Sequence, residues 1–212
     1  MNYEEARAFL DEVGKTGSVL GLESMKELLK RLENPQNQLK FIHISGTNGK
    51  GSELAFLSEI LTEAGYRTGR YISPTLYSYR ERIQVDGEWI DRESLAHYVA
   101  VVKEAIEAIE ADGLSVPTVF EVETAISFLY FCDKKCDIVM LETGMGGTLD
   151  ATNVVKTTIL EVMEYLEFER ALREEYREYI EKIQAEWGDE TAVESSQKVW
   201  VEYSDDDSFR TI

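Results

Sequence analysis

The chain has 212 residues, of which 43% are hydrophobic and 30% charged, and its formal net charge is −19 at pH 7. This length fits one large domain, or one domain with an appendage, and the apolar content is ordinary for a globular protein. The negative charge argues against a nucleic-acid partner, which needs a basic surface, and no apolar run approaches the ~20 residues that cross a membrane.

The first third of the chain predicts two short helices, then a buried strand, then a third helix. Apolar residues recur at helical spacing in 3–13, 24–32 and 54–64, and the apolar run at 39–44 suits a buried strand. Between that strand and the third helix lies the sequence GTNGKGS, residues 46–52. A strand, a glycine-rich turn, a lysine, a hydroxyl and a helix, in this order, are typical of loops that hold nucleotide phosphates.

This glycine-rich loop is a candidate phosphate site because its residue types favour an anion. Glycines let backbone N–H groups approach closely, the helix N-terminus adds partial positive charge, Lys50 adds a full one, and Ser52 suits phosphate or Mg²⁺. Ile44 stands where the usual P-loop pattern has its first glycine, and Gly51 separates the lysine from the serine, so a glycine turn with a solvated lysine is the alternative. The candidate nucleotide ligands are Gly46, Thr47, Asn48, Gly49, Lys50, Gly51 and Ser52.

The middle of the chain continues the alternation of strands and helices. The predicted elements are a strand at 68–72, a hairpin at 83–90, helices at 92–111 and 122–131, and a buried strand at 137–141. Such alternation predicts an α/β fold, with a mostly parallel sheet and helices on both of its faces. Ligands of such sheets bind at the carboxyl ends of the strands, where the loops 45–52, 73–82 and 142–153 would meet.

Two of these loops carry further candidate residues. Ser73 follows the second strand and suits a metal ligand or a simple cap. Arg80 and Arg82 suit the stabilisation of a transferred phosphoryl group, or form a solvated basic pair. Glu142 ends the third buried strand and suits Mg²⁺, although a structural turn is the alternative for the glycine-rich loop that follows it. His43, on the first strand, is more simply interpreted as a satisfied core histidine than as a ligand.

The composition changes after about residue 162. Residues 163–212 contain 15 acidic and 6 basic residues, a net charge of −9 in under a quarter of the length. The elements predicted in this part are a fourth strand at 157–162, a long helix at 161–187 and a short strand at 199–203. We therefore expect a nucleotide-binding domain at 1–160 and an acidic appendage, helical with a short β segment, at 161–212.

The chain shows no targeting feature. Its start, MNYEEARAFL, is polar and acidic, unlike a secretory signal or a transit peptide. The two cysteines, Cys132 and Cys136, do not make a disulfide scaffold. A cytoplasmic setting with reduced thiols is therefore expected.

Together, these motifs resemble the N-terminal part of the folylpolyglutamate synthase/dihydrofolate synthase family, a branch of the Mur ligase superfamily, over residues 1 to about 160. The segments that carry the resemblance are GLESM (21–25), HISGTNGKGS (43–52), AGYRTGRYISP (64–74), RERIQVDGEWI (80–90), TVFEVETA (118–125) and ETGMGGTLDATN (142–153). Their order and spacing fit the family as well. The resemblance implies a P-loop-type, ATP-binding Mur ligase central domain that is incomplete in this chain.

The resemblance also implies an activity, an ATP-dependent ligase of folate and one-carbon metabolism with ATP and Mg²⁺ as cofactors. Such an enzyme adds L-glutamate to folate or dihydropteroate through an acyl-phosphate intermediate. Lys50, Ser73 and Glu142 take the catalytic positions, with Lys50 on the phosphates and with Ser73 and Glu142 on the metal. The family's pterin and folate contacts fall on Thr118, Val119, Phe120, Glu121, Leu149 and Asp150.

The sequence departs from the family pattern at two positions and in the tail. Many relatives have histidine in place of Thr75 and arginine in place of Thr148, which leaves the preference between dihydropteroate and folate open. The family's further magnesium-binding histidine, its carbamylated lysine and its C-terminal domain are not recognisable after residue 158. Residues 178–212 faintly resemble the small domain that precedes some lytic murein transglycosylases.

These departures predict a truncated form of the ligase with low or no activity. The first alternative is a module that binds nucleotide or folate without turnover. The second is an interaction protein that acts through the acidic helix. The sequence leaves the oligomeric state open.

Overall fold

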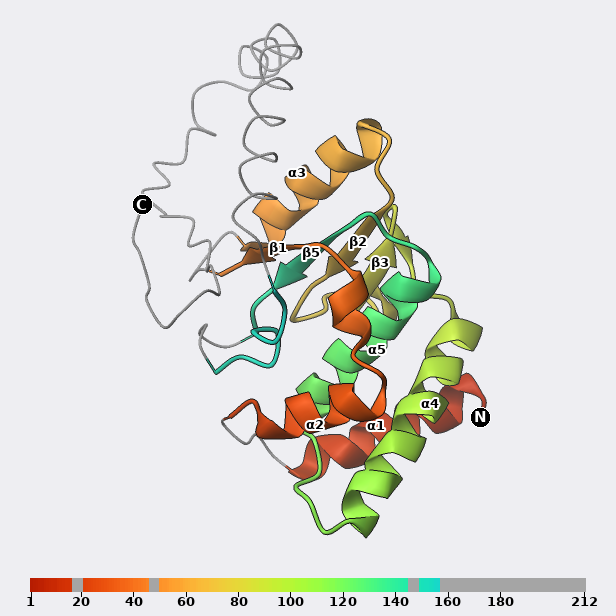
Figure 1. Ribbon diagram of the computed structural model, residues 1–212. Coiled ribbons are helices and arrows are strands. Elements are labelled where there is room, and N and C mark those ends of the chain that lie inside the picture. The colour runs from red at the N-terminus through yellow and green to blue at the C-terminus, as the bar shows by residue number, and fades with distance from the viewer. Residues whose placement is uncertain (17–20, 46–49, 145–148, 157–212) are drawn as a thin grey trace, which may run out of the picture.

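The computed structural model describes residues 1–16, 21–45, 50–144 and 149–156 (Figure 1). Its α-helices are α1 (Tyr3–Val13), α2 (Glu23–Arg31), α3 (Lys50–Glu63), α4 (Arg92–Ala111) and α5 (Val119–Asp133). Its strands are β1 (Phe41–Ile44), β2 (Thr68–Tyr71), β3 (Ile83–Val85), β4 (Glu88–Trp89) and β5 (Ile138–Glu142). Short 3₁₀ helices are η1 (Gly14–Thr16), η2 (Pro35–Gln38) and η3 (Tyr79–Arg82).

The described strands form one sheet in the order β1-β5-β2-β3-β4. Strand β5 lies between β1 and β2 and runs parallel to both, so the carboxyl ends of these three strands lie at one edge. Strands β3 and β4 form an antiparallel hairpin beside β2, and its turn residues Asp86 and Gly87 have φ of 51° and 81°, as a type I′ turn requires. The sheet is therefore mixed. The three buried strands are parallel, as predicted, and the hairpin adds an antiparallel edge.

Side-chain caps fix where several helices begin. Asn2 at α1 and Thr118 at α5 each form a capping box with the glutamate three residues later, and Asp91 caps α4. Because Thr118 is the cap, α5 begins three residues before its predicted start at 122. Helix α3 likewise begins at Lys50 rather than at 54, so the candidate lysine is the first residue of this helix.

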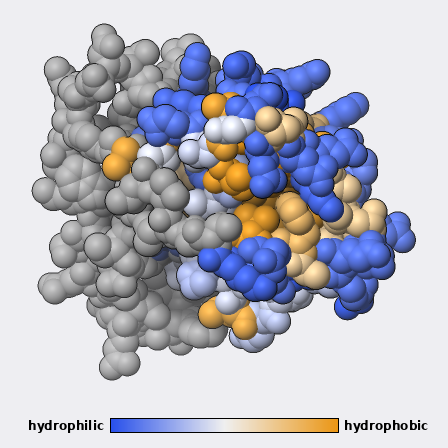
Figure 2. Space-filling view, turned by 90° about the horizontal axis from the view of Figure 1, so that it is seen from below, coloured by the Kyte–Doolittle hydropathy of each residue, from blue (hydrophilic) through white to orange (hydrophobic). Residues whose placement is uncertain are grey.

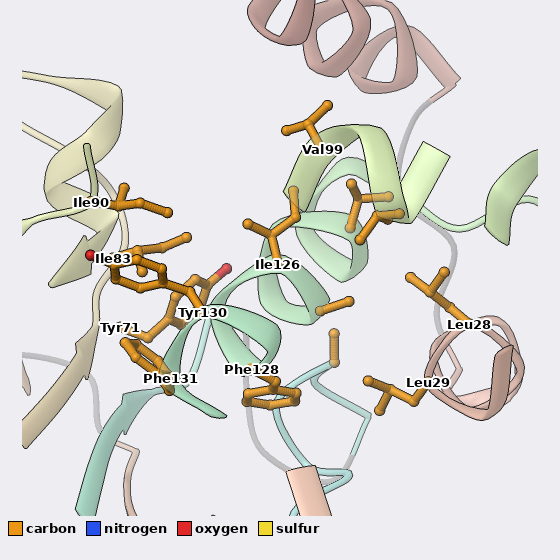
Figure 3. Close-up of a cluster of buried hydrophobic side chains, with 14 of the residues drawn as sticks. Leu28, Leu29, Tyr71, Ile83, Ile90, Val99, Ile126, Phe128, Tyr130 and Phe131 are labelled. Atoms are coloured by element: carbon orange, nitrogen blue, oxygen red, sulfur yellow. The ribbon is translucent and has the colours of Figure 1, made fainter. Parts of the chain in front are cut away.

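Helix α5 lies at the centre of the main core. It is apolar on nearly every side, which is typical of a helix surrounded by protein. Its fully buried apolar side chains are Val122, Ala125, Ile126, Phe128 and Phe131. Figure 3 shows Tyr71 and Ile83 of the sheet on one side of α5, and Leu28 and Leu29 of α2 on the other. Gly69 permits the close approach of α5 to β2, because a Cβ there would lie 2.9 Å from the Phe131 ring.

A smaller core covers the opposite face of the sheet. Ile44 and Met140 pack there with Leu54 and Leu61 of α3. The sheet therefore lies between α3 on one face and α5, with the other helices behind it, on the second face (Figure 1). Helices on both faces of an α/β sheet were predicted, and this part of the fold is confirmed.

The surface of the described part is largely hydrophilic when it is seen from below, with one region of hydrophobic residues between the charged ones (Figure 2). None of the described helices combines the length and the apolarity that a membrane span requires. The predicted strands at 157–162 and 199–203 and the predicted helix at 161–187 lie outside the described residues.

Candidate active site

Lys50, Ser73 and Glu142 come together at the carboxyl ends of the parallel strands. Glu142 is the last residue of β5, Ser73 follows β2 by two residues, and Lys50 begins α3. The backbone N–H of Ser73 donates to Glu142 Oε2 over 3.1 Å, and Lys50 Nζ lies 3.9 Å from Glu142 Oε1. The alternation of strands and helices predicted that three loops would meet at this edge, and one residue from each does so.

The Glu142 carboxylate is buried at the edge of the sheet, with 6% of the residue exposed. Burial raises the pKa of Glu142, against the opposing effects of the Ser73 N–H and the Lys50 charge. A buried carboxylate with this incomplete compensation favours a nearby cation. A carboxylate and a serine hydroxyl are oxygen donors of the kind that Mg²⁺ takes, so Glu142 and Ser73 fit a magnesium ion.

Glu81 fixes the loop that carries Ser73. The backbone N–H groups of Leu76, Tyr77 and Ser78 all donate to its carboxylate, the latter two over 2.8 Å and 3.0 Å. Burial raises the pKa of Glu81, but these three bonds outweigh it and lower the pKa overall. The Leu76 and Tyr77 side chains are 81% and 88% exposed, so backbone hydrogen bonds rather than apolar packing hold this loop.

Arg82 belongs to a buried ion pair. Its Nη1 lies 2.9 Å from Glu123 Oε2, and the two side chains are 13% and 7% exposed. The Tyr79 hydroxyl donates to the other Glu123 oxygen over 2.6 Å, and Arg80 Nη1 donates to the Ile90 carbonyl over 3.0 Å. The prediction of a solvated basic pair is therefore wrong, and the Arg82 charge is balanced inside the fold.

The Phe120 ring, at the start of α5, lies against the loop that follows β5. A Cβ at Gly144 would lie 2.5 Å from this ring, so the close contact requires glycine. The ring also lies 6.0 Å from that of Tyr71, centroid to centroid. The structure thus brings one predicted folate contact next to the loop of Glu142.

Glu121 and Thr118, two more of the predicted folate contacts, already have partners within the fold. Glu121 is 2% exposed, and its carboxylate accepts hydrogen bonds from Ser24 Oγ over 2.5 Å and from the Thr118 N–H over 2.6 Å. Thr118 is also buried, while Val119 is half-buried. These bonds fix the start of α5, and a contact of either residue with a substrate stays a prediction.

Asp150, in the turn after β5, is tied to strand β1. Its Oδ1 accepts from the Thr152 hydroxyl over 2.5 Å and from the Thr152 N–H over 3.0 Å. The Thr152 hydroxyl lies 2.7 Å from His43 Nε2. His43 is 5% exposed, which confirms its interpretation as a satisfied core histidine. The neighbouring Leu149 is 53% exposed.

Sequence reasoning did not single out the roles of Glu81 and Thr152. Glu81 stands three residues after Ser78, and this spacing is the signal of a capping box. The contact of Thr152 with His43 has no local signal, because the two residues are 109 positions apart.

Part of the predicted site lies outside the described residues, namely Gly46, Thr47, Asn48 and Gly49. Gly51 and Ser52 are in the first turn of α3, and both are exposed. The predicted phosphate loop is thus described only from Lys50 onward.

Comparison with known proteins gives a consistent set of relatives, although no protein-family model matches the chain. The chain is 42% identical over 155 residues to the dihydrofolate synthase/folylpolyglutamate synthase of Bacillus subtilis, which is 73% of this chain and 36% of that protein. The solved folylpolyglutamate synthase of Thermotoga maritima is similar with a TM-score of 0.68 and 42% identity, over 73% of this chain and 36% of that one.

A further solved structure carries ligands. It is a bifunctional folylpolyglutamate synthase/dihydrofolate synthase with Mn, AMPPNP and L-glutamate bound. It is similar to this chain with a TM-score of 0.65 and 34% identity, over 74% of this chain and 36% of that one. The chain therefore spans about a third of the length of the relatives it matches.

Proposed function

We propose that this chain, about three quarters of which belongs to the folylpolyglutamate synthase/dihydrofolate synthase family, is the nucleotide-binding part of an ATP-dependent ligase of folate metabolism. The observation that carries the proposal is the meeting of Lys50, Ser73 and Glu142 at one edge of the sheet. A lysine at the start of a helix, beside a buried carboxylate, suits the triphosphate of a nucleotide and its metal ion. The proposed setting is the cytoplasm, because both cysteines of the chain are free thiols.

The proposed reaction joins L-glutamate to folate or dihydropteroate. ATP transfers its γ-phosphoryl group to the substrate carboxylate, the glutamate amino group attacks the acyl phosphate, and phosphate leaves with the amide bond formed. The names of the relatives and the bound Mn, AMPPNP and L-glutamate in one of them support this reaction. Positioning and electrostatic stabilisation supply most of the rate enhancement in such phosphoryl transfers.

The proposed roles follow from the charges of the three residues. Lys50 contacts the phosphates, and the N-terminus of α3 adds partial positive charge at the same place. Glu142 and Ser73 hold Mg²⁺, which offsets the negative charge of the phosphates. The Ser73 N–H orients the Glu142 carboxylate through the hydrogen bond of 3.1 Å.

The proposed folate contacts lie on the loop after β5 and at the start of α5. Phe120 and the exposed Leu149 offer apolar surface to an aromatic ring system, and the Asp150 carboxylate can accept N–H groups of a pteridine. The Phe120 ring packs against Gly144, in the loop that follows Glu142. This van der Waals contact keeps the proposed folate contacts close to the proposed phosphate site.

The test is nucleotide binding by the full chain. Titration calorimetry with AMPPNP and Mg²⁺ is expected to give an affinity at least about tenfold weaker for Lys50→Ala than for the wild type, because the variant loses one charge on the phosphates. The matched control is Lys26→Ala, which removes an exposed lysine of α2 and is expected to bind as the wild type does. Equal affinity of Lys50→Ala and the wild type would overturn the proposal.

A further inference from the structure

His43, Thr152 and Asp150 form a buried chain of hydrogen bonds. Thr152 is fully buried, and His43 and Asp150 are each 5% exposed. This hydrogen-bond chain runs from His43 Nε2 to the Thr152 hydroxyl over 2.7 Å, and from that hydroxyl to Asp150 Oδ1 over 2.5 Å. It joins two segments that are 109 residues apart in the sequence.

The directions of these bonds follow from the number of protons. The Thr152 hydroxyl has one hydrogen, which it donates to the Asp150 carboxylate. The hydroxyl must therefore accept from His43, so the imidazole carries its proton on Nε2. Burial lowers the pKa of His43 to about 4, against the opposing charge of Asp150, which agrees with a neutral ring at pH 7.

The turn of Asp150 has two local hydrogen bonds besides this buried network. Within the turn, Thr152 N–H donates to Asp150 Oδ1 over 3.0 Å and Asn153 N–H donates to the Asp150 carbonyl over 2.8 Å. These two bonds shape the turn, and Ala151 and Val155 of the same segment are part of the main core. The His43–Thr152 bond ties the turn to β1, the strand that leads toward Lys50.

We propose that Thr152 and His43 are positioning residues that hold the Asp150 carboxylate for the pteridine ring of the substrate. The inference rests on the proposed function, because that function makes Asp150 a folate contact. Thr152 orients Asp150 directly, and His43 acts on Asp150 only through the Thr152 hydroxyl. Neither residue needs to touch the substrate.

The first measurement is independent of any ligand. The chain has two histidines, so ¹⁵N spectra of the labelled protein, compared with a His97→Gln variant, assign His43. A neutral His43 with its proton on Nε2 is expected at pH 7. A proton on Nδ1 instead, or a charged ring, would overturn the bond directions.

The second measurement uses amide hydrogen exchange over residues 149–155. Exchange is expected to rise about tenfold in His43→Leu, which has no donor, and to return close to the wild-type rate in His43→Gln, whose amide can donate from the position of Nε2. Equal exchange in His43→Leu and the wild type would show that the anchor is dispensable, which would overturn the proposal. The exposed His97→Gln variant is the control for the loss of a histidine.

The third measurement is binding of folate to the full chain in the presence of AMPPNP. Thr152→Val keeps the shape and loses the hydroxyl, so folate affinity is expected to fall about tenfold, whereas Thr152→Ser restores it. AMPPNP affinity is expected to stay within about twofold in both variants. Equal folate affinity of the Val and Ser variants would overturn the positioning role. Failure of the wild type to bind folate would instead contradict the proposed function, and the spectra and exchange rates would still decide the anchor.

Discussion

Burial sets the chemistry of the individual residues at the candidate site. Glu142 lies at the end of a buried strand, where the Ser73 N–H and the Lys50 ammonium group lie near its carboxylate, and burial raises its pKa. Glu81 is equally buried, but three backbone N–H groups surround its carboxylate and lower its pKa. A buried glutamate therefore favours a bound cation at position 142, whereas at position 81 it holds a loop through backbone hydrogen bonds.

Replacement of Glu142 by Gln is expected to reduce the effect of Mg²⁺ on nucleotide binding. The substitution keeps the size of the side chain and removes the charge that would hold the ion. We expect the gain in AMPPNP affinity on addition of Mg²⁺ to fall about tenfold in a calorimetric titration. Glu63→Gln, an exposed position at the end of α3, is the matched control. A Mg²⁺ effect that is unchanged in Glu142→Gln would argue against this metal ligand.

The buried His43 is expected to make the fold sensitive to mild acid. Its pKa is about 4 in the folded protein, below the ordinary value of 6.5 that applies to the unfolded chain. Between these two values the unfolded state binds a proton that the folded state does not, so the free energy of unfolding falls as the pH falls. The free energy of unfolding falls by about 3 kcal/mol when the pH reaches the folded-state pKa of about 4, and this loss is absent above pH 6.5.

Urea unfolding of the wild type and His43→Gln between pH 4 and 7 measures this effect. As the pH falls through this window, the wild type is expected to lose stability relative to His43→Gln, because Gln does not titrate. A difference that stays constant with pH would contradict the buried neutral histidine.

At the scale of elements, helix α5 and the loop 73–82 are coupled by buried polar contacts. Glu123 of α5 accepts from Arg82 and Tyr79, which lie at the two ends of η3. Glu81 holds the middle of the loop, and Ser73 contacts Glu142 at its start. The loop is thus fixed to both the sheet and α5, although its tip is exposed.

Loss of the Glu123 charge is expected to destabilise this coupling strongly. Glu123→Gln leaves the buried Arg82 guanidinium without its counter-charge, which typically costs about 3 kcal/mol of stability. The control is Glu107→Gln, because Glu107 pairs with Lys103 on the exposed side of α4 and is expected to cost less than about 0.5 kcal/mol. Chemical denaturation measures both, and equal losses would contradict the role of the buried pair.

At the scale of the whole molecule, the chain matches about a third of the length of its relatives. The described part contains a sheet with three parallel strands, and Lys50, Ser73 and Glu142 lie close together at the carboxyl ends of these strands. About two thirds of each of these relatives lies outside the matched region. Nucleotide binding by this polypeptide and its completion of the ligation therefore need separate measurements.

The 212-residue polypeptide alone is expected to add glutamate to folate very slowly or not at all. Phosphate release in the presence of ATP, Mg²⁺, folate and L-glutamate is expected to stay far below the rates of about 1 s⁻¹ and above that are typical of enzymes. The full-length Bacillus subtilis relative, assayed in parallel, is the positive control. Turnover by this polypeptide at about 1 s⁻¹ or more would contradict the expectation.

Local patterns in the sequence were sufficient for the order of the elements, for the β3–β4 turn and for the identity of Lys50, Ser73 and Glu142 as candidates, because periodicity, turn chemistry and strand-end position are local properties. The start of α5 was missed although its capping box, Thr118 with Glu121, is a local signal. The sequence did not predict the ion pair of Arg82 with Glu123 or the hydrogen-bond chain from His43 to Asp150. Those features depend on partners that are distant in the sequence. Only the packing of α5 against the sheet, and of the turn after β5 against β1, brings these partners within hydrogen-bonding distance and removes the water that would otherwise screen them.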